Sequence, residues 1–444
     1  MLDTIYALSS AVGRAGVAVI RVSGPLSHTS LAVLTGGMPI KPRFAKLCKL
    51  IHPDTQATID HTLVISFTNP SSFTGEDCVE YHCHGSPAVI QEMLNFFASQ
   101  SKHRVAEPGE FTRRAFENGK MDLTEAEAVA DLIHAETSLQ KQQALSQMEG
   151  GLSSIYREWG ERLKKSLAYL EASIDFADDE LPDDFLTPIL VDLKTLSYDI
   201  AHHLDDNRRG ERMRDGFSVV VIGVPNAGKS SLINCLVQRD VAIVSDISGT
   251  TRDVIEAHLD IGGYPVIISD TAGLRPDALS EDYKDKIESE GIRRALARAK
   301  SADLKILMFN GSEGLASQIE TQNLIDGNSL VVINKSDLSR ENFELDGLSL
   351  STKTEENISV LLDMIKEKLD TLMGFGESVS LTRQRHRDSL LEAKDSIDRS
   401  LSSQQMDLMA EDIRLSMRAL GKITGRVDVE DLLDIIFGDF CIGK

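Results

Sequence analysis

One loop limits the folds open to this chain more than any other stretch. Gly223 is followed by four residues and then by Gly228, Lys229 and Ser230, within the run "GVPNAGKSS", which stands between the apolar "FSVVVI" and the helical "LINCLV". Glycines at these positions let backbone N–H groups surround phosphate oxygens at a helix N-terminus, while Lys229 adds positive charge and the Ser230 hydroxyl reaches Mg²⁺. The run therefore predicts a phosphate-binding loop between a strand and a helix.

The residues around this loop predict a nucleotide-binding α/β domain over positions 216–370. Short apolar runs alternate there with helical stretches, and they read "FSVVVIG", "PVIISD", "ADLKILMF" and "SLVVIN". Such alternation is typical of a mainly parallel sheet. The last run leads into "NKSD", where the carboxylate of Asp337 is suited to accept from both N1 and the 2-amino group of guanine. Because adenine lacks this donor pair, the site predicts GTP rather than ATP.

Three further motifs complete the predicted nucleotide site. "DTAG" closes a strand and is expected to support Mg²⁺ and sense the γ-phosphate, "GTTRD" places Thr251 on Mg²⁺ beside Ser230, and "LSLSTK" is expected to offer backbone N–H groups to guanine. The expected GTP-binding residues are Asn226, Ala227, Gly228, Lys229, Ser230, Ser231, Ser245, Asp246, Ile247, Ser248, Gly249, Thr250, Thr251, Asp270, Thr271, Ala272, Gly273, Asn334, Lys335, Ser336, Asp337, Ser351, Thr352 and Lys353.

Hydrolysis needs a group that orients the attacking water, and it needs a positive charge that stabilises the transition state. The residue after "DTAG" is Leu274, whose apolar side chain does neither. Asn226, together with carbonyl groups of Ser245, Ile247 and Thr250, predicts a site for a bare monovalent cation in the role of an arginine finger, with potassium as the natural candidate. The alternative for Asn226 is a loop residue that hydrogen-bonds its own backbone.

The remaining segments predict a multidomain protein. Residues 1–118 show the short apolar runs and turns of an α+β domain, and residues 119–215 and 371–444 are helical in pattern. Within 119–215, apolar residues recur every three or four positions from Leu152 to Ile174, as in a helix with one buried face. We therefore expect an α+β N-terminal domain and an all-α helical domain into which an α/β P-loop GTPase domain is inserted.

Composition restricts the partners and the compartment. The formal net charge of -22 repels phosphate backbones, so RNA requires a local basic patch or a partner. No run of about 18 apolar residues and no secretory signal is visible, so we expect no membrane association and a cytoplasmic location. Solvated helix faces are the alternative for the basic clusters. These clusters are Arg208, Arg209, Arg212 and Arg214; Arg293, Arg294 and Arg298; and Arg383, Arg385 and Arg387.

The assembled motifs resemble the MnmE (TrmE) family of tRNA uridine-modification GTPases over essentially the whole chain. The nucleotide motifs are shared by many GTPases, whereas the N-terminal blocks and the tail are specific to this family. Thr352 departs from the pattern, since "STK" stands where the family has "SAK". The matching blocks are "GRAGVAVIRVSGP", "SFTGEDCVEYHCHGSP", "AEPGEFTRRAFENGKMDLTEAEAV", "GVPNAGKSSLIN", "SDISGTTRDV", "DTAGLR", "RQRH" and "ITGRVDVEDLLDIIFGDFCIGK".

The resemblance implies a specific activity. Proteins of this family form homodimers through their N-terminal domains and act as a heterotetramer with the FAD-dependent subunit MnmG (GidA). Together they add an aminomethyl or carboxymethylaminomethyl group at C5 of the wobble uridine, position 34, of certain tRNAs. A reduced folate, 5-formyl- or 5,10-methylenetetrahydrofolate, supplies the one-carbon unit, and the G domains meet across potassium when GTP is hydrolysed. The competing interpretation is a regulatory GTPase switch in RNA or ribosome assembly.

The resemblance also assigns a folate site to Arg21, Glu80, Lys120 and Lys444. A pterin ring presents nearly the same donor pair as guanine, so a carboxylate such as Glu80 is suited to read it, while Arg21 and a lysine suit the carboxylates of the folate tail. If Lys444 reaches a folate, the tail is ordered beside the N-terminal domain of its own chain or of its dimer mate. Cys441 then lies within reach as a nucleophile, and the alternative is a small side chain packed with its neighbours.

The water-orienting glutamate is assigned by spacing. The family pattern Glu-x-x-Gly-Ile is satisfied by Glu288, and Glu281 and Glu290 remain open because the stretch after "DTAG" is long. The catalytic candidates are Glu288, Lys229, Thr250 and Cys441.

Overall fold

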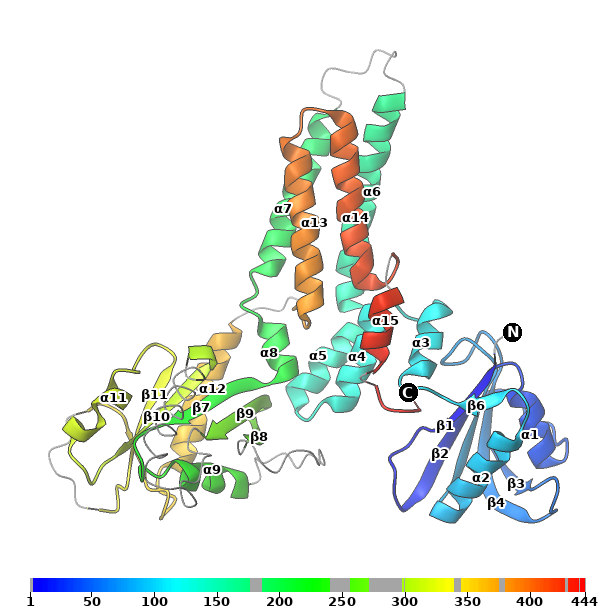
Figure 1. The fold of residues 1–444 in the computed structure, drawn as a ribbon, viewed down its shortest axis with the longest axis horizontal. Helices are drawn as coiled ribbons and strands as arrows, with labels where there is room; N and C mark the ends of the chain where they lie inside the picture. Colours follow the sequence, from blue (N-terminus) through cyan, green and yellow to red (C-terminus); the bar gives the residue numbers. More distant parts are fainter. Residues whose placement is uncertain are drawn as a thin grey trace, which may run out of the picture. The chain divides into compact units, whose positions relative to one another are not determined.

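The computed structural model divides into two compact units, and Figure 1 labels their helices and strands. The first unit comprises Met1–Ala130, Met148–Asp183 and Asp395–Lys444, and the second comprises Asp131–Gln147 and Asp184–Lys394. The residues that the structure describes are 3–175, 186–239, 256–270, 298, 300–338, 345–374, 380–427, 430–438 and 440–443.

The N-terminal part of the first unit is an α+β fold, which confirms the sequence prediction. Its six-stranded sheet has the order β3-β4-β5-β2-β1-β6, antiparallel throughout except for the parallel pair β1 and β6. Tyr81 on β5 and Met93, Phe96 and Phe97 on α2 are fully buried in its core. The elements are β1 (Thr4–Leu8), β2 (Ala15–Ser23), α1 (Ser27–Thr35), β3 (Lys46–Ile51), β4 (Thr58–Phe67), β5 (Cys78–Gly85), α2 (Pro87–Ser99) and β6 (His103–Val105).

A buried ionic cluster fixes the loop between β4 and β5 against α3 (Glu110–Glu117). Arg114 is only 5% exposed, and its guanidinium lies 3.2 Å from Glu76 and 2.9 Å from Glu110. Burial alone raises the pKa of Glu110, but hydrogen bonds from Arg104 and Arg114 outweigh it and hold that pKa below its ordinary value. Since breaking a buried ion pair leaves an uncompensated charge, this cluster strongly favours one position of the loop.

The helical part of the first unit contains α4 (Leu123–His134) up to Ala130, α6 (Gly151–Asp175), α14 (Met406–Thr424) and α15 (Glu430–Gly438). The predicted apolar face of residues 152–174 lies on α6, and its members Leu152, Trp159, Leu163 and Leu170 are buried. This face packs against α14. Phe437 of α15 and the following Phe440 pack on Leu123 and Ala126 of α4. This contact anchors the chain just before its carboxyl-terminal tail.

The second unit is built on a sheet of order β12-β11-β10-β7-β9-β8. The four strands expected from the sequence, β7, β9, β10 and β11, are mutually parallel, and β8 is the one antiparallel strand among those that the structure describes in this sheet. The predicted α/β nucleotide-binding domain is thus confirmed. The elements are α7 (Thr187–Leu204), α8 (Arg209–Asp215), β7 (Phe217–Ile222), α9 (Lys229–Gln238), β8 (Glu256–Ile261), β9 (Tyr264–Asp270), β10 (Leu304–Asn310), α11 (Ile319–Gln322), β11 (Ser329–Asn334), β12 (Leu348–Ser349), α12 (Ile358–Met373) and the first part of α13 (Gln384–Ser402), up to Lys394. The rest of α13, from Asp395, belongs to the first unit.

Part of α5 (Ser138–Met148) joins this unit through contacts with α8 and the β8–β9 turn. The side-chain amide of Gln140 donates to the carbonyl of Arg214 over 3.1 Å, and that of Gln143 donates to the carbonyl of Gly210 over 3.0 Å. At the turn, a Cβ on Gly263 would lie 3.1 Å from Leu139 Cγ. Residues 131–147 are therefore in direct contact with the sheet that carries the nucleotide motifs.

Candidate functional site

The phosphate loop connects β7 to α9, as the sequence predicts. A Cβ on Gly223 would lie 2.1 Å from the carbonyl oxygen of Met308, and one on Gly228 would lie 2.2 Å from Asn334 Nδ2. Gly228 also has φ +100°, a conformation that side chains disfavour. Gly223 is therefore required by its close contact with β10, and Gly228 by its close contact with the "NKSD" segment. The sequence alone only suggests these two requirements.

The functional side chains of the loop gather at the N-terminus of α9. The ammonium group of Lys229, the first residue of α9, donates to the carbonyls of Gly223 over 2.8 Å and Val224 over 3.1 Å. Ser230 follows in the first turn and is exposed, and Asn226 is exposed with φ 63°. Because a helix N-terminus carries partial positive charge, this end of α9 offers a cation, a hydroxyl and backbone N–H groups to an anion.

Asn334 links the phosphate loop to the predicted guanine loop. It is 1% exposed, and its amide nitrogen donates to the carbonyl of Ala227 over 2.7 Å, while its amide oxygen accepts from the backbone N–H of Thr352 over 3.0 Å. The hydroxyl of Thr352 accepts from the same amide nitrogen over 3.3 Å, a contact that alanine at this position would lack. Ser351 donates to the carboxylate of Asp337 over 2.8 Å, so the carboxylate that is predicted to read guanine is also held in place.

Several expected site residues cannot be compared with the structure. β9 ends at Asp270, opposite Val221 of β7, so this strand leads to the same edge of the sheet as the phosphate loop. The following residues lie outside the described part of the chain: Ser245, Asp246, Ile247, Ser248, Gly249, Thr250, Thr251, Thr271, Ala272, Gly273, Glu281, Glu288, Glu290 and Lys444.

In the first unit, the structure brings Arg21 and Glu80 together. They face each other on β2 and β5, and Arg21 Nε donates to Glu80 Oε1 over 3.0 Å. The guanidinium also lies over the rings of Phe73 and Phe111, 5.2 and 5.5 Å from their centres. The result is a charged pair flanked by two aromatic rings, an arrangement suited to a flat, polar ligand.

Lys120 contacts the same loop that carries Phe73. Its ammonium group donates to the carbonyl of Pro70 over 3.0 Å, and a Cβ on Gly75 would lie 3.3 Å from Lys120 Cγ. Three of the four predicted folate residues are thereby grouped around the segment from Asn69 to Glu76. The aromatic contacts of Phe73 and Phe111 were not predicted, because phenylalanines in "SFTGED" and "GEFTRR" carry no sequence signal that separates a ring over a cation from ordinary core.

The carboxyl-terminal tail returns to the N-terminal sheet of its own chain. Ile442 forms an antiparallel bridge with Pro108, and a Cβ on Gly443 would lie 2.3 Å from the carbonyl oxygen of Leu8. Leu8 is adjacent to Ala7, the β1 partner of Arg21. Of the two arrangements that the sequence left open, the structure has the tail beside its own domain, and Cys441 is exposed rather than buried.

The arginine clusters proposed as RNA-binding patches face carboxylates in the second unit. Arg212 lies 2.7 Å from Asp303, and Arg214 and Arg383 lie 3.0 and 2.7 Å from Asp131. These side chains therefore serve internal ion pairs in the structure. Arg293 and Arg294 lie outside the described residues.

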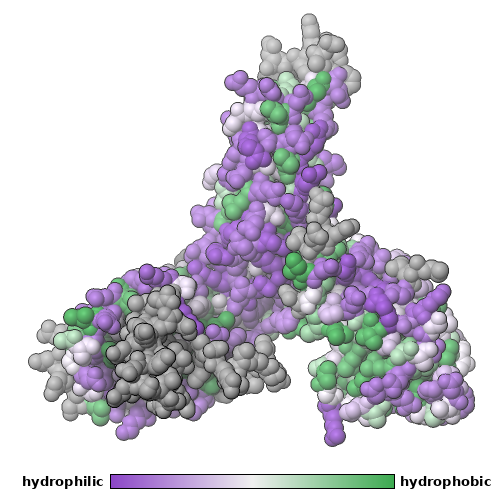
Figure 2. Space-filling view, in the orientation of Figure 1, coloured by the Kyte–Doolittle hydropathy of each residue, from purple (hydrophilic) through white to green (hydrophobic). Residues whose placement is uncertain are grey.

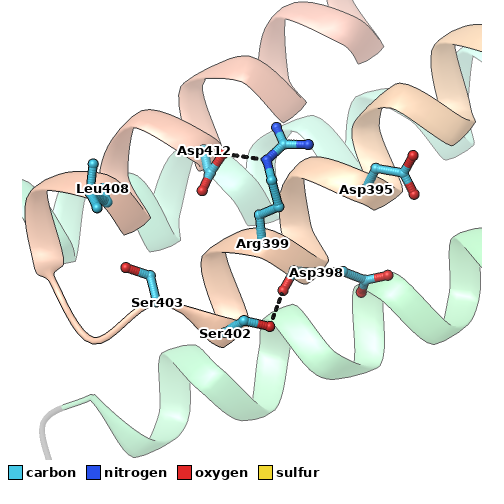
Figure 3. A pocket seen from close by; sticks show the side chains of 7 residues that line it. All are labelled: Asp395, Asp398, Arg399, Ser402, Ser403, Leu408 and Asp412. Carbon is cyan, nitrogen blue, oxygen red and sulfur yellow. Dashed lines mark hydrogen bonds and ion pairs between the residues drawn. The ribbon is translucent and has the colours of Figure 1, made fainter.

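A shallow hollow lies between α13 and α14 at the end where the two helices join (Figure 3). Arg399 points across it and donates to Asp412 over 3.0 Å. It is lined by Asp395, Asp398, Arg399, Ser402, Ser403, Leu408 and Asp412. None of the predicted site residues lines it. Within the described residues, no helix is both long and apolar enough to cross a lipid bilayer.

Comparison with known proteins gives full-length matches. A family model described as the GTP-binding protein TrmE N-terminus matches residues 4–120, and one described as the MnmE helical domain matches residues 123–441. The tRNA modification GTPase MnmE of Parvibaculum lavamentivorans is 51% identical over 449 residues, and that of Rickettsia akari is 46% identical over 451 residues, each with 100% of both chains covered. The solved G domain of the T. maritima FeoB iron transporter is 21% identical with a TM-score of 0.24, covering 36% of this chain and 99% of that chain.

The five cysteines differ in a way that thiol labelling can measure. Cys441 is exposed, whereas Cys48, Cys78, Cys83 and Cys235 are buried, and burial raises the pKa of Cys78 to about 12. Since the thiolate is the reacting form, we expect 5,5′-dithiobis(2-nitrobenzoate) to give one fast reaction in the native protein. Cys441→Ser should abolish the fast phase and Cys235→Ser should leave it. A fast phase that persists in Cys441→Ser would contradict the exposure seen here.

Proposed function

The chain belongs to the MnmE family of tRNA modification GTPases, and we propose that it is a potassium-dependent GTP hydrolase that acts with a flavin-dependent MnmG partner. Family membership makes it a GTP-hydrolysing enzyme involved in tRNA modification. The proposed product is an aminomethyl or carboxymethylaminomethyl group at C5 of the wobble uridine, with a reduced folate as one-carbon donor. The observation that carries the nucleotide part is Asn334, which joins the phosphate loop to the guanine loop.

Mg²⁺ and GTP fit the residues at the N-terminus of α9. Ser230 is the described ligand candidate for Mg²⁺, with Thr251 as its proposed companion, and Lys229 supplies charge to the β- and γ-phosphates. The ion would neutralise charge that develops on the phosphate oxygens. Asp337, held by Ser351, would accept from guanine. Of these groups, Lys229 and Ser230 follow β7 and Asp337 follows β11, and these two parallel strands end at the same edge of the sheet.

Potassium is proposed because the described loop holds no arginine or glutamine for hydrolysis. Between Gly223 and Ser230 the polar side chains are Asn226, Lys229 and Ser230. Asn226 is exposed, and its left-handed backbone places it in the outward turn of the loop. Its amide oxygen is suited to a hard cation, and the proposed further ligands are carbonyls of Ser245, Ile247 and Thr250. Glu288 remains the proposed water-orienting residue.

GTP hydrolysis should depend on potassium through Asn226. We expect the wild-type rate in KCl to exceed that in NaCl at equal ionic strength by roughly 10- to 1,000-fold, the range that a missing positive charge at the transition state would cover. Asn226→Ala should lose most of this activation because it removes the side-chain ligand. Rates are measured as phosphate release at saturating GTP and Mg²⁺.

Pro225→Ala is the matched control, since Pro225 is the exposed neighbour of Asn226 and offers no side-chain ligand. It should keep the potassium activation. Equal wild-type rates in both salts would remove the cation mechanism and favour the alternative, a regulatory GTPase switch in RNA or ribosome assembly that needs an activating partner.

The folate proposal is supported by the grouping of Arg21, Glu80 and Lys120. Glu80 is partly buried and paired with Arg21, whose guanidinium lies over two aromatic rings, which favours a flat ring with paired N–H donors over a solvated ion. Arg21 and Lys120 provide positive charge for carboxylates, and Gly443 brings the chain end close to β1, so that Lys444 is the proposed fourth residue. The folate would supply a one-carbon unit, and Cys441 is the proposed nucleophile near it.

Glu80→Gln should weaken the binding of 5-formyltetrahydrofolate by roughly tenfold or more, because it removes a charged acceptor for two hydrogen bonds. Isothermal titration measures the affinity. The GTPase rate should stay unchanged. Glu92→Gln, on α2 at the other face of the sheet, is the control and should bind like wild type. Equal affinity of Glu80→Gln and wild type would place the folate elsewhere.

Homodimer formation is proposed through the sheet face that α1 and α2 leave uncovered. Leu47 and Leu63 are directly opposite each other on β3 and β4 and are 66% and 39% exposed, and Val17 on β2 is 54% exposed. Figure 2 shows hydrophobic residues gathered on the surface of this N-terminal part. Exposed apolar side chains in one patch are typical of a protein interface. A second copy of this face is the proposed occupant, and the MnmG dimer completes the heterotetramer.

Light scattering should give twice the mass of one chain for the wild type. Leu63→Asp should shift it to one chain mass because a charge in an apolar interface is costly to desolvate. Val191→Asp, at an exposed position of α7, is the control. Addition of the flavin-containing partner should give a larger species that contains both proteins. An unchanged mass for Leu63→Asp would exclude this face as the interface.

A further inference from the structure

A buried pair of amide residues lies behind the nucleotide site. Asn310 is the last residue of β10, and Gln318 ends the 3₁₀ turn Leu315–Gln318; both are 0% exposed. The side chain of Gln318 accepts from the backbone N–H of Asn310 over 2.8 Å and donates to its backbone carbonyl over 3.0 Å. One side chain thus satisfies both backbone groups of a residue at the end of a central strand.

The side chain of Asn310 is fully engaged as well. Its nitrogen donates to the carboxylate of Glu313 over 2.6 Å, and its oxygen accepts from the hydroxyl of Ser312 over 2.8 Å. Buried polar groups that are all paired form a rigid unit, because loss of any one bond leaves a costly unsatisfied partner. The loop after β10 is therefore fixed at the position where it meets β11.

This rigid unit contacts Asn334 directly. The next residue, Gly311, donates its backbone N–H to the carbonyl of Asn334 over 2.9 Å, and a Cβ on Gly311 would lie 2.8 Å from that oxygen. Asn334 in turn bonds the phosphate loop at Ala227 and the guanine loop at Thr352. A continuous set of contacts thus runs from Gln318 to both halves of the nucleotide site.

We propose that Gln318 is a positioning residue for the guanine nucleotide, because it holds the end of β10 against Asn334 and thereby fixes the phosphate loop relative to the guanine loop. Among the described residues, the side chain of Gln318 hydrogen-bonds Asn310 and forms no hydrogen bond with the phosphate loop or the guanine loop. The proposal rests on guanine nucleotide binding by the site around Asn334 and Asp337, and is independent of potassium and folate.

The bond geometry explains why glutamine suits this position. An amide carries one acceptor and two donors, so it is able to pair with a backbone N–H and a backbone carbonyl at once, as a neighbouring strand does. Methionine has a similar length and no such groups. In Gln318→Met, the buried backbone N–H of Asn310 loses the side-chain acceptor of Gln318, and the carbonyl of Asn310 keeps only the N–H of Glu313 over 3.2 Å. The end of β10 is thereby released from the position that Gly311 and Asn334 require.

The test measures nucleotide affinity in the folded full-length protein. Gln318→Met should weaken the binding of fluorescently labelled GDP by roughly tenfold, mainly through faster release, and should raise the KM for GTP with little change in kcat. Thr321→Val is the matched control, since Thr321 is buried on the adjacent α11 and the hydrogen bonds of Asn310 described above do not involve it. Thermal melting without nucleotide reports whether each variant is folded at the assay temperature.

Two further variants separate positioning from general destabilisation. Gly311→Ala leaves the amide pair intact but introduces a Cβ against the carbonyl of Asn334, and it should show the same loss of GDP affinity. In an Asn334→Ala background, Gln318→Met should add less than about a twofold further loss, because its effect passes through Asn334.

Three results would contradict the positioning role of Gln318 or the proposed function on which it rests. Normal GDP affinity in folded Gln318→Met, or a loss equal to that of Thr321→Val, would overturn the positioning role. Independent, multiplying losses in the double variant would also overturn it. A wild-type protein that does not bind GDP would instead contradict the proposed function itself.

Discussion

The buried side chain of Asn334 is the contact on which the nucleotide site depends. Its amide nitrogen bonds the carbonyl of Ala227, its oxygen accepts from the N–H of Thr352, and its backbone carbonyl accepts from Gly311. The parallel sheet makes this possible, since β7, β10 and β11 are neighbours whose carboxyl ends lie at one edge. The loops that carry Ala227, Gly311 and Thr352 are distant in sequence and are therefore held together by this single residue. The contacts of Asn334 thus set the distance between the phosphate and base subsites.

The strands and the phosphate loop were predictable because each depends on a local pattern. The runs that end at Ile222, Asp270, Asn310 and Asn334 all form strands of one sheet. The hydrogen bonds that hold the ends of these strands in place were not predictable. Gln318 lies in a stretch without periodicity, and a glutamine that pairs with backbone looks the same in sequence as one in solvent. Its role appears only when the turn after β10 folds back over eight residues.

In the N-terminal part, family blocks identified charged residues but not what positions them. Arg21 and Glu80 were expected at a ligand site, and the β2–β5 register sets the two residues directly opposite each other. The loop that carries Phe73 toward Arg21 depends on Arg114, which bonds Glu76 in that loop and Glu110 on its own helix. In the sequence, such an arginine looks like any other charged residue of an amphipathic helix. Its burial cannot be predicted from the pattern because burial is set by tertiary packing.

Electrostatics explains why the predicted arginine clusters are poor anchors for tRNA. Asp131 faces both Arg214 and Arg383, and Asp206 faces Arg387, whose side chain is only 14% exposed. A phosphate contact at these side chains requires an existing ion pair to be broken, and the carboxylate left behind then repels the same phosphate. On a chain of net charge -22 there is little background attraction to offset this cost. The side chains of these two clusters therefore serve to hold α4, α8 and α13 together through Asp131 and Asp206, rather than to attract a phosphate backbone.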